Sequence, residues 1–180
     1  SISPDGSSIA FTYKGNIFIV PADGGKAFQL TTNSGYDADP IWTPDGKSIV
    51  FSSYREKSKD IYKVSAEGGN PVRLTSHTQN ETPLEVMKDG SVLYTANIQQ
   101  DAQYGDFPGN VQLYMVGPDG GKPVQVTSLP VSNIGVNEGA DGTKVIYEDY
   151  KGYEDALRKH HTSSVTRDIW MYTPGSSDKG

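Results

Sequence analysis

A β-hairpin is predicted by the stretch Ile41-Trp42-Thr43-Pro44-Asp45-Gly46-Lys47-Ser48-Ile49-Val50-Phe51. The apolar residues at both ends indicate two short strands, and Pro44-Asp45-Gly46 is a turn signal between them. Proline presets the φ angle of the first central turn position, aspartate bonds to the nearby backbone, and glycine adopts the left-handed conformation. We therefore expect Gly46 to close a three-residue hairpin loop.

The same turn recurs along the chain. A full copy is Ser3-Pro4-Asp5-Gly6, and two copies without proline are Lys88-Asp89-Gly90 and Ala140-Asp141-Gly142. The aspartates of successive copies are 40, 44 and 52 residues apart. A period of about 40–50 residues with four short strands is typical of propeller blades. Helical repeats are disfavoured because no helix-length window shows a clean period of about 3.6 residues.

Each turn is followed by the same signals in a fixed order. A strand ends in an aromatic residue at Phe11, Phe51, Tyr94 and Tyr147. An aliphatic–aromatic pair follows at Ile17-Phe18, Ile61-Tyr62, Leu113-Tyr114 and Ile169-Trp170. In the first three copies a Gly-Gly turn then leads to an aliphatic–Thr pair. We name the strands of one unit a, b, c and d, and we predict that Trp42 and Trp170 are core residues.

The predicted fold is all-β, with residues 1–180 forming a partial β-propeller of about three and a half blades of four antiparallel strands. The expected repeat units are about 1–34, 35–80, 81–130 and 131–180, the first lacking strand a and the last lacking strand d. A closed propeller needs at least about four blades, and an open arc exposes sheet edges. We therefore expect the chain to be part of a longer polypeptide.

Composition narrows the function classes. The chain of 180 residues has 16 Lys and Arg against 22 Asp and Glu, for a net charge of −6, which argues against nucleic acid or an anionic membrane as partner. It has no cysteine, which excludes disulfides, thiol nucleophiles and zinc–thiolate sites. No apolar run reaches the roughly 20 residues of a membrane span, so we expect no membrane insertion. We also expect no cofactor.

Loop lengths indicate where binding should occur. In an up-and-down sheet the a–b and c–d turns share one face, and the b–c loops share the other. The span between the aromatic residues of strands b and c grows from 7 to 11, 20 and 23 residues along the chain. Long loops on a rigid scaffold commonly carry binding function. The b–c loop face is therefore the predicted binding face.

The two longest b–c loops supply the candidate binding residues. The segment from Tyr150 to Arg167 is rich in basic and imidazole side chains, which suit an anionic group such as a peptide carboxylate. The alternative is that these charges pair within the loop. The polar loop Gln99 to Pro108 also carries two aromatic residues. The candidate peptide- or partner-binding residues are Tyr153, Arg158, Lys159, His160, His161, Arg167, Tyr104 and Phe107.

The sequence disfavours both a catalytic site and a metal site. Adjacent His160 and His161 point opposite ways on an extended chain, and the remaining histidine, His77, is distant in sequence. A triad of Ser163, His160 and Asp155 or Asp168 lacks a Gly-x-Ser-x-Gly nucleophile elbow. Asp37-Ala38-Asp39 and Glu81 make calcium conceivable, but we expect them to cap turns and to be solvated at the inter-blade crossings. We predict no catalytic residue and no metal site.

Two sets of residues resemble known families. The run of Ser3-Pro4-Asp5-Gly6, Ile9-Ala10-Phe11, Ile17-Phe18-Ile19-Val20-Pro21-Ala22, Gly24-Gly25 and Leu30-Thr31 resembles the TolB-type, WD40-like (PD40) propeller repeat. Phe11 to Gly15, Lys151 to Asp155 and Arg158 to Trp170 are similar to the N-terminal propeller of tricorn-like serine peptidases (the S41 class), particularly bacterial extracytoplasmic homologues. The resemblance covers essentially the whole chain. The two turns without proline depart from the repeat, which weakens turn preorganisation rather than the fold assignment.

The resemblance implies a function without implying a catalytic residue. In tricorn-like peptidases the propellers are thought to guide peptides, and the catalytic serine and histidine lie in C-terminal domains. The expected function is therefore a non-catalytic propeller module that binds or gates peptides through the b–c loop face, within a parent serine peptidase. The alternative is a TolB-like protein-interaction propeller of the bacterial envelope with no linked enzyme. An independent propeller enzyme is disfavoured because no defined acid, base or metal cluster is present.

The resemblance also suggests partners and location. Expected partners are peptides or the remaining domains of the parent peptidase, and an oligomer is compatible with the sequence. The expected location is the periplasm or another extracytoplasmic compartment, with the cytoplasm as the alternative.

Overall fold

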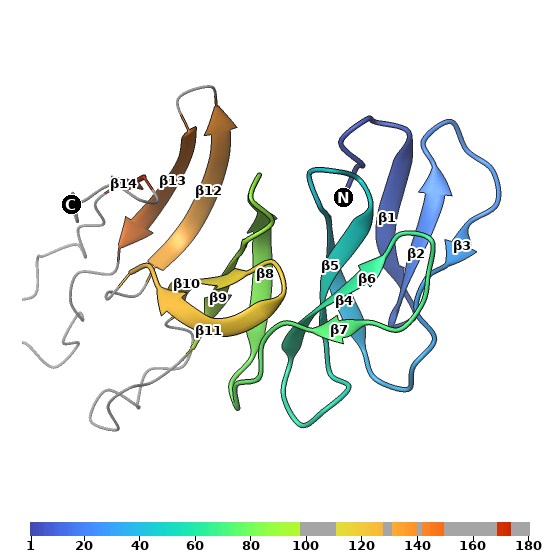
Figure 1. The fold of residues 1–180 in the computed structure, drawn as a ribbon, viewed down its shortest axis with the longest axis horizontal. Coiled ribbons are helices and arrows are strands. Elements are labelled where there is room, and N and C mark those ends of the chain that lie inside the picture. The colour runs from blue at the N-terminus through green and yellow to red at the C-terminus, as the bar shows by residue number, and fades with distance from the viewer. Residues whose placement is uncertain (98–110, 128–130, 140–141, 150–168, 174–180) are drawn as a thin grey trace, which may run out of the picture.

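The structure is a computed structural model that describes residues 1–97, 111–127, 131–139, 142–149 and 169–173. These residues form fourteen β-strands in four sheets, and they include no helix. No membrane-spanning helix is therefore found among them. The sheets follow one another in chain order from β1 to β14, as Figure 1 shows. This arrangement confirms the predicted all-β fold of propeller blades.

Strands that are consecutive in sequence pair antiparallel within each sheet. The first sheet contains β1 (Ser8–Tyr13), β2 (Asn16–Pro21) and β3 (Phe28–Gln29), with an isolated bridge from Ile2 to Ile9. The second contains β4 (Asp37–Trp42), β5 (Ser48–Ser53), β6 (Asp60–Ser65) and β7 (Val72–Arg73). The third contains β8 (Glu81–Val86), β9 (Val92–Ala96), β10 (Gln112–Gly117) and β11 (Gly120–Gln125). The fourth contains β12 (Val131–Gly139), β13 (Gly142–Asp149) and β14 (Ile169–Tyr172).

The turn at Pro44-Asp45-Gly46 is one residue longer than predicted. The Thr43 N–H donates to the Ser48 carbonyl at 2.9 Å, which leaves four residues between the two strand ends. The Thr43 hydroxyl donates to Asp45 at 2.6 Å and accepts the Ser48 N–H at 3.0 Å. The Thr43 hydroxyl thus accepts the Ser48 backbone N–H, which in a shorter loop would bond to the neighbouring strand instead. This hydrogen bond stabilises the longer loop. Gly46 has a φ of 67°, the left-handed conformation that the sequence predicted.

The other two described copies explain the difference. In the first sheet Ser3 replaces the threonine, and its hydroxyl makes the same pair of bonds, to Asp5 at 2.6 Å and from the Ser8 N–H at 2.9 Å. In the third sheet a methionine, Met87, takes this position, and its N–H donates to the Ser91 carbonyl across a three-residue loop. The longer loop therefore occurs where a hydroxyl precedes the Pro-Asp-Gly sequence.

The a–b and c–d turns lie on one face, which we call the turn face. In the first sheet the Ala22 N–H donates to the Ser7 carbonyl at 2.8 Å, which ties the c–d turn to the a–b turn. In the second sheet the Ala66 N–H donates in the same way to Lys47 at 2.9 Å. These bonds place the short turns of both sheets at the same end of the strands.

The opposite face, which we call the loop face, carries the b–c loops and the crossings between sheets. The Asp37 N–H donates to the Gly15 carbonyl at 2.9 Å, so the crossing into the second sheet runs beside the b–c loop of the first. The Glu81 N–H donates to the Lys59 carbonyl at 2.8 Å, which repeats this contact one sheet further on. Each crossing is therefore fixed to the preceding b–c loop.

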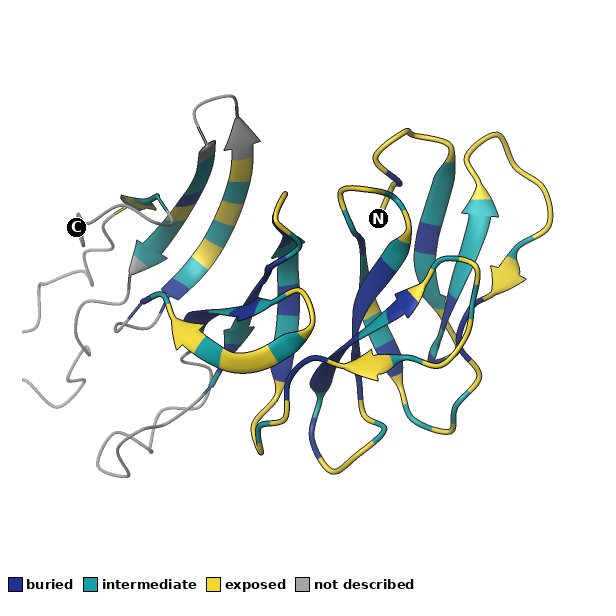
Figure 2. Cartoon of the chain, in the orientation of Figure 1, coloured by how far each residue is buried: buried dark blue, intermediate teal, exposed yellow. Residues whose placement is uncertain are grey.

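The core lies between neighbouring sheets. One buried cluster joins the first and second sheets around Trp42 and Phe51, and another joins the second and third sheets around Val50 and Tyr94. Trp42 is 8% exposed, which confirms that it is a core residue. The strand b and strand c aromatics stack in pairs, at ring distances of 5.8, 6.0 and 5.8 Å in Phe11–Phe18, Phe51–Tyr62 and Tyr94–Tyr114. Figure 2 shows the d strands β3, β7 and β11 as the exposed rim.

Trp170 was predicted to be a core residue, and it is half-buried instead. Its neighbour Ile169 is 76% exposed, although Ile17, Ile61 and Leu113 at the same repeat position are fully buried. In the described part of the chain, the fourth sheet has a neighbouring sheet on one side (Figure 1). The other side of β14 therefore has no described layer to pack against.

Candidate functional site

The candidate binding residues from the sequence belong to the two longest b–c loops. All of them lie outside the described residues: Tyr104, Phe107, Tyr153, Arg158, Lys159, His160, His161 and Arg167. The considered triad residues Asp155, Ser163 and Asp168 also lie there. The described part of the loop face is formed by the b–c loops of the first and second sheets and by the two crossings beside them. The site is built from these segments.

Three exposed tyrosines lie on the loop face between the first and second sheets. Tyr13 ends β1, Tyr36 precedes β4 and Tyr54 follows β5, and they are 54%, 56% and 42% exposed. The Tyr54 N–H donates to the Tyr36 carbonyl at 3.1 Å. The Tyr36 ring lies against Gly15, where an added Cβ would be 3.2 Å from it. We call these three residues the tyrosine patch.

The first b–c loop is short because Lys14 and Gly15 both have positive φ angles, of 49° and 78°. Such a pair forms a two-residue turn whose twist matches the strands, and β1 pairs with β2 up to Tyr13 and Asn16. The Lys14 ammonium lies 5.3 Å from the centre of the Tyr13 ring. The tyrosine patch therefore has the Lys14 cation beside Tyr13.

An ion pair between Arg55 and the buried Asp37 lies next to Tyr54 of the tyrosine patch. Asp37 is fully buried, and its carboxylate accepts hydrogen bonds from Arg55 at 2.9 Å and from the Ser53 hydroxyl at 2.5 Å. The Arg55 guanidinium lies 5.4 Å from the centre of the Phe51 ring and 5.3 Å from that of Tyr62. Arg55 directly follows Tyr54 in sequence, so the ion pair and the two rings fix the backbone beside an exposed tyrosine.

The equivalent position in the third sheet is Glu81, which is also buried, at 1% exposure. The Thr75 hydroxyl donates to one carboxylate oxygen, and the other oxygen has no hydrogen-bond partner among the described residues. Burial raises the pKa of Glu81 to about 7, against the lowering effect of the Thr75 hydrogen bond. Burial likewise raises the pKa of Tyr94, whose hydroxyl has no described partner either.

Another buried carboxylate, Asp60, lies near Glu81 and has a cationic partner. Asp60 is fully buried beside Arg73, with 2.8 Å between carboxylate and guanidinium. Burial raises the pKa of Asp60 more than the Arg73 charge lowers it. This pair lies on strands c and d of the second sheet, next to the crossing that carries Thr75 and Glu81.

The prediction that Asp37 and Glu81 are solvated at the crossings was wrong. Both are buried because the crossing is hydrogen-bonded to the b–c loop of the preceding sheet, which covers the start of strand a. In the described residues no group of three or more His, Cys, Asp or Glu side chains is arranged to hold a metal ion. These carboxylates therefore belong to the structural support of the loop face.

Loop length does not predict the tyrosine patch. Tyr13 and Tyr54 belong to the two shortest b–c spans, and Tyr36 belongs to a crossing. The available signal was that Tyr13 and Tyr54 each follow closely after the aromatic residue that ends strand b, at Phe11 and Phe51. Tyrosine at a strand end on the predicted binding face is a candidate contact residue.

The described sheets define the class of protein: a β-propeller domain built from antiparallel blades, of which the structure describes three or four strands each. A family model matches residues 2–179, and the chain belongs to that family, the tricorn protease N-terminal beta propeller domain. The family resemblance inferred from the sequence is thereby confirmed.

Individual relatives agree with this family. The chain is 26% identical over 170 residues to a protein named tricorn protease homolog 1 from Streptomyces coelicolor, covering 93% of the chain and 15% of the relative. It matches the structure of a putative TolB from Agrobacterium tumefaciens with a TM-score of 0.59 and 26% identity, over 72% of the chain and 48% of the other. It matches the crystal structure of the tricorn protease with a TM-score of 0.65 and 20% identity, over 92% and 16%. The chain thus spans a minor part of these longer proteins.

Proposed function

We propose that this domain is a non-catalytic propeller module of a tricorn-like peptidase that binds and gates peptides through its loop face. The observation that carries the proposal is the tyrosine patch, with three rings about half exposed on the face where the b–c loops gather. Tyrosine offers a large contact area at a small cost in side-chain entropy, and it is enriched where proteins bind peptides and other proteins. Membership of the tricorn N-terminal propeller family supports the same role.

The chemistry beside the patch suits a peptide main chain. The Lys14 ammonium lies over Tyr13, and it can bind a peptide carbonyl or a C-terminal carboxylate. Tyrosine hydroxyls both donate and accept hydrogen bonds, which fits the alternating carbonyl and N–H groups of an extended peptide. We assign no catalytic residue to the chain, so the peptidase reaction is proposed for other parts of a longer polypeptide.

The test uses the full-length natural polypeptide that contains this chain. Binding of short fluorescent peptides is measured by anisotropy for Tyr36→Ala and Tyr54→Ala, with peptide turnover as a second readout. Each change should weaken peptide binding by roughly fivefold to thirtyfold, because a contact aromatic contributes about 1–2 kcal/mol. In turnover, KM should rise while kcat is retained, since the tyrosines are placed away from the reacting atoms.

The matched control is Phe28→Ala. Phe28 is an aromatic residue with a similar exposure of 53%, but it lies on the rim strand β3. Its replacement should leave peptide affinity and KM unchanged. Equal losses in the Phe28 and tyrosine variants, or wild-type binding in all of them, would contradict the proposal.

The alternative is a TolB-like interaction propeller in the bacterial envelope, which the likeness to the Agrobacterium TolB structure favours. In that case the loop face would bind a folded protein, and the full-length polypeptide would show no peptide turnover. For either function we propose a location in the periplasm or another extracytoplasmic compartment, with the cytoplasm as the alternative, and cell fractionation of the native protein tests this. Turnover that depends on Tyr36 and Tyr54 separates the peptidase reading from the TolB-like reading.

A further inference from the structure

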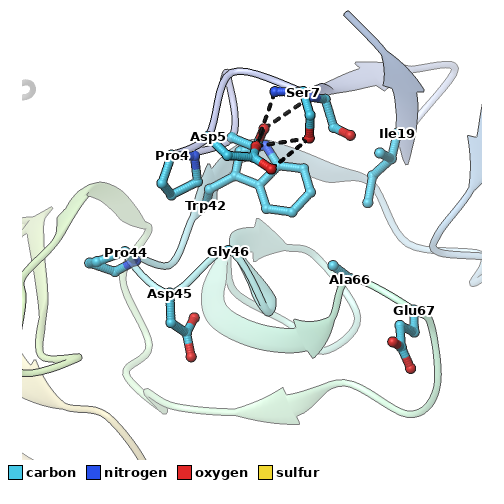
Figure 3. A pocket seen from close by; sticks show the side chains of 12 residues that line it. Pro4, Asp5, Ser7, Ile19, Trp42, Pro44, Asp45, Gly46, Ala66 and Glu67 are labelled. Carbon is cyan, nitrogen blue, oxygen red and sulfur yellow. Dashed lines mark hydrogen bonds between the residues drawn. The ribbon is translucent and has the colours of Figure 1, made fainter.

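The turn face, opposite the tyrosine patch, carries a concave site. A pocket of about 600 Å³ opens between the first and second sheets. Figure 3 shows that it is bordered by the a–b turns of both sheets and by the c–d turn of the second. Its lining includes Asp5, Ile19, Trp42, Pro44, Asp45 and Glu67. We call it the turn-face pocket.

Part of the pocket wall is apolar and includes the indole of Trp42. Trp42 lines it together with Ile19 and Pro44, and Figure 3 shows the indole beside Asp5. Trp42 is 8% exposed, and its Nε1–H has no hydrogen-bond partner among the described residues. A buried donor without a partner is uncommon in folded proteins. Trp42 therefore contributes an aromatic surface to the pocket.

Three carboxylates from three different turns also line the pocket: Asp5, which lies beside the indole, and Asp45 and Glu67, which lie further from it (Figure 3). Hydrogen bonds from the Ser3 hydroxyl and from Ser7 lower the pKa of Asp5 to about 2, so this carboxylate is ionised at neutral pH. The residues that line the pocket include no lysine, arginine or histidine. The turn-face pocket is therefore anionic.

Asp5 and Asp45 have a structural role in their own turns, whereas Glu67 has none among the described residues. Asp5 and Asp45 accept hydrogen bonds that shape their own turns. Glu67 is exposed, and its carboxylate makes no hydrogen bond or ion pair with a described residue. The turn that holds it is closed by backbone bonds, from Ala66 to Lys47 and from Gly68 to Ser65. Glu67 is thus free to contact a ligand.

The next blade pair shows that this chemistry is not a general property of the repeat. At the positions equivalent to Trp42 and Pro44, the third sheet has Val86 and Lys88. The same crevice one blade further on would therefore have an aliphatic wall and a basic residue at its border. The combination of an indole with carboxylates is therefore present at the junction of the first and second sheets and is not repeated at the junction of the second and third.

We propose that the turn-face pocket binds the basic side chain, arginine or lysine, of a polypeptide segment. The alkyl part of such a side chain packs on Trp42 and Ile19, and its cation meets the indole face and the carboxylates of Asp45 and Glu67. A pocket of about 600 Å³ is larger than one side chain, so it also holds neighbouring residues of the segment. This site is independent of the peptide site proposed at the loop face.

The test measures binding of a short peptide with blocked termini and a single arginine to the full-length natural polypeptide. A matched peptide carries citrulline, which has nearly the shape of arginine without its charge. The arginine peptide should bind at least about fivefold more tightly than the citrulline peptide, and its affinity should fall as salt is raised. Equal affinities for the two peptides, or no binding of either at millimolar concentration, would overturn the proposal.

Variants locate the site. Glu67→Gln should weaken binding of the arginine peptide by roughly threefold to tenfold without affecting the fold, since its carboxylate has no structural partner. Trp42→Phe should weaken binding further while keeping an aromatic ring in the core. Glu56→Gln, at an exposed glutamate of the loop face, should bind like the wild type. If Trp42→Phe does not fold, Glu67→Gln decides alone.

Two further outcomes count against the proposal. Wild-type affinity in Glu67→Gln places the arginine elsewhere. Loss of arginine-peptide binding in the Tyr36→Ala variant, with Glu67→Gln unaffected, assigns that peptide to the loop face. Because the two sites use different residues on opposite faces, failure at one leaves the other unaffected.

Discussion

Asp37 and Glu81 begin strand a in consecutive blades, yet the two buried carboxylates meet different partners. Asp37 has a guanidinium at 2.9 Å, whereas the bond described to Glu81 comes from the neutral hydroxyl of Thr75. An ionised carboxylate in a low-dielectric site is costly unless a cation or several donors compensate for lost water. One blade junction therefore holds a charged pair, and the next holds a carboxyl group that retains its proton up to near neutral pH.

Glu81 should make stability depend on pH. Burial raises its pKa in the folded state from 4.5 to about 7, so the folded state binds the proton more tightly than the unfolded chain does. Its contribution is fully present below about pH 4.5 and is lost as pH rises through about 7. Glu81→Gln should remove this loss, so that the variant gains Tm relative to the wild type as pH rises from 4.5 to about 7.

The control for this experiment is Glu56→Gln, which changes an exposed glutamate. Its Tm difference from the wild type should stay constant over the same pH range. Nearby Asp60 also has a raised pKa and contributes in the same direction, so the comparison of variant with wild type is needed to isolate Glu81. A Glu81→Gln profile parallel to the wild type would contradict the assignment.

The Asp37–Arg55 pair should contribute far more to stability than a surface pair. Arg55→Met leaves Asp37 buried without its cation, and it removes the guanidinium from the Phe51 and Tyr62 rings. We expect a loss of about 3 kcal/mol in the free energy of unfolding, measured by urea titration. The control is Lys59→Met, whose partner Asp39 is 41% exposed, and it should cost less than about 1 kcal/mol. Similar losses in both variants would show that the Asp37 pair is not specially buried.

At the scale of the hairpin, the Thr43 hydroxyl should be worth a measurable free energy. It bonds both to Asp45 and to the Ser48 N–H, and valine has the same shape without either bond. Thr43→Val should lower the free energy of unfolding by about 1–2 kcal/mol, read from urea midpoints at constant slope. Thr43→Ser keeps the hydroxyl and should lose much less. Equal losses would mean that the methyl group, rather than the hydroxyl, fixes the turn.

These hairpins show what the sequence can predict. The repeated Asp-Gly turn signal correctly predicted the positions of the three described turns, the left-handed Gly46 and the strands on either side of it, because all of these depend on residues close in sequence. It did not predict the extra loop residue, because that depends on whether residue 43 or 87 carries a hydroxyl. Repeat spacing then predicted the propeller class, which the four sheets confirm.

The described site was less predictable because its residues meet through long-range contacts. Tyr36 reaches the patch through its packing on Gly15, and Arg55 reaches Asp37 over 18 residues of sequence. Neither contact has a local signature. Glu81 and Asp37 look like solvated loop acids in the sequence, and only the crossing of one blade over the next buries them. The candidate residues between Tyr150 and Arg167 remain predictions.

At the scale of the whole molecule, one glycine of the third sheet lies against the backbone of the second sheet. Gly120, in the c–d turn of the third sheet, has a φ of 85°, and an added Cβ would lie 2.9 Å from the Leu74 carbonyl oxygen of the second sheet. Gly24 holds the same repeat position in the first sheet, with a φ of 97° and no atom within 4 Å of such a Cβ. Both glycines therefore adopt a positive φ angle, but only Gly120 lies close to the backbone of a neighbouring blade.

Alanine at the two positions therefore separates strain from packing between blades. Gly24→Ala should cost about 1 kcal/mol, the penalty for a left-handed alanine. Gly120→Ala carries the same penalty plus a clash with backbone, and it should cost at least about 1–2 kcal/mol more. Hydrogen exchange should also become faster near Leu74 in Gly120→Ala alone, because the clash pushes the second and third sheets apart. Equal losses of stability, with unchanged exchange near Leu74, would show that the sheets shift to accept a methyl group and are not rigidly packed at this junction.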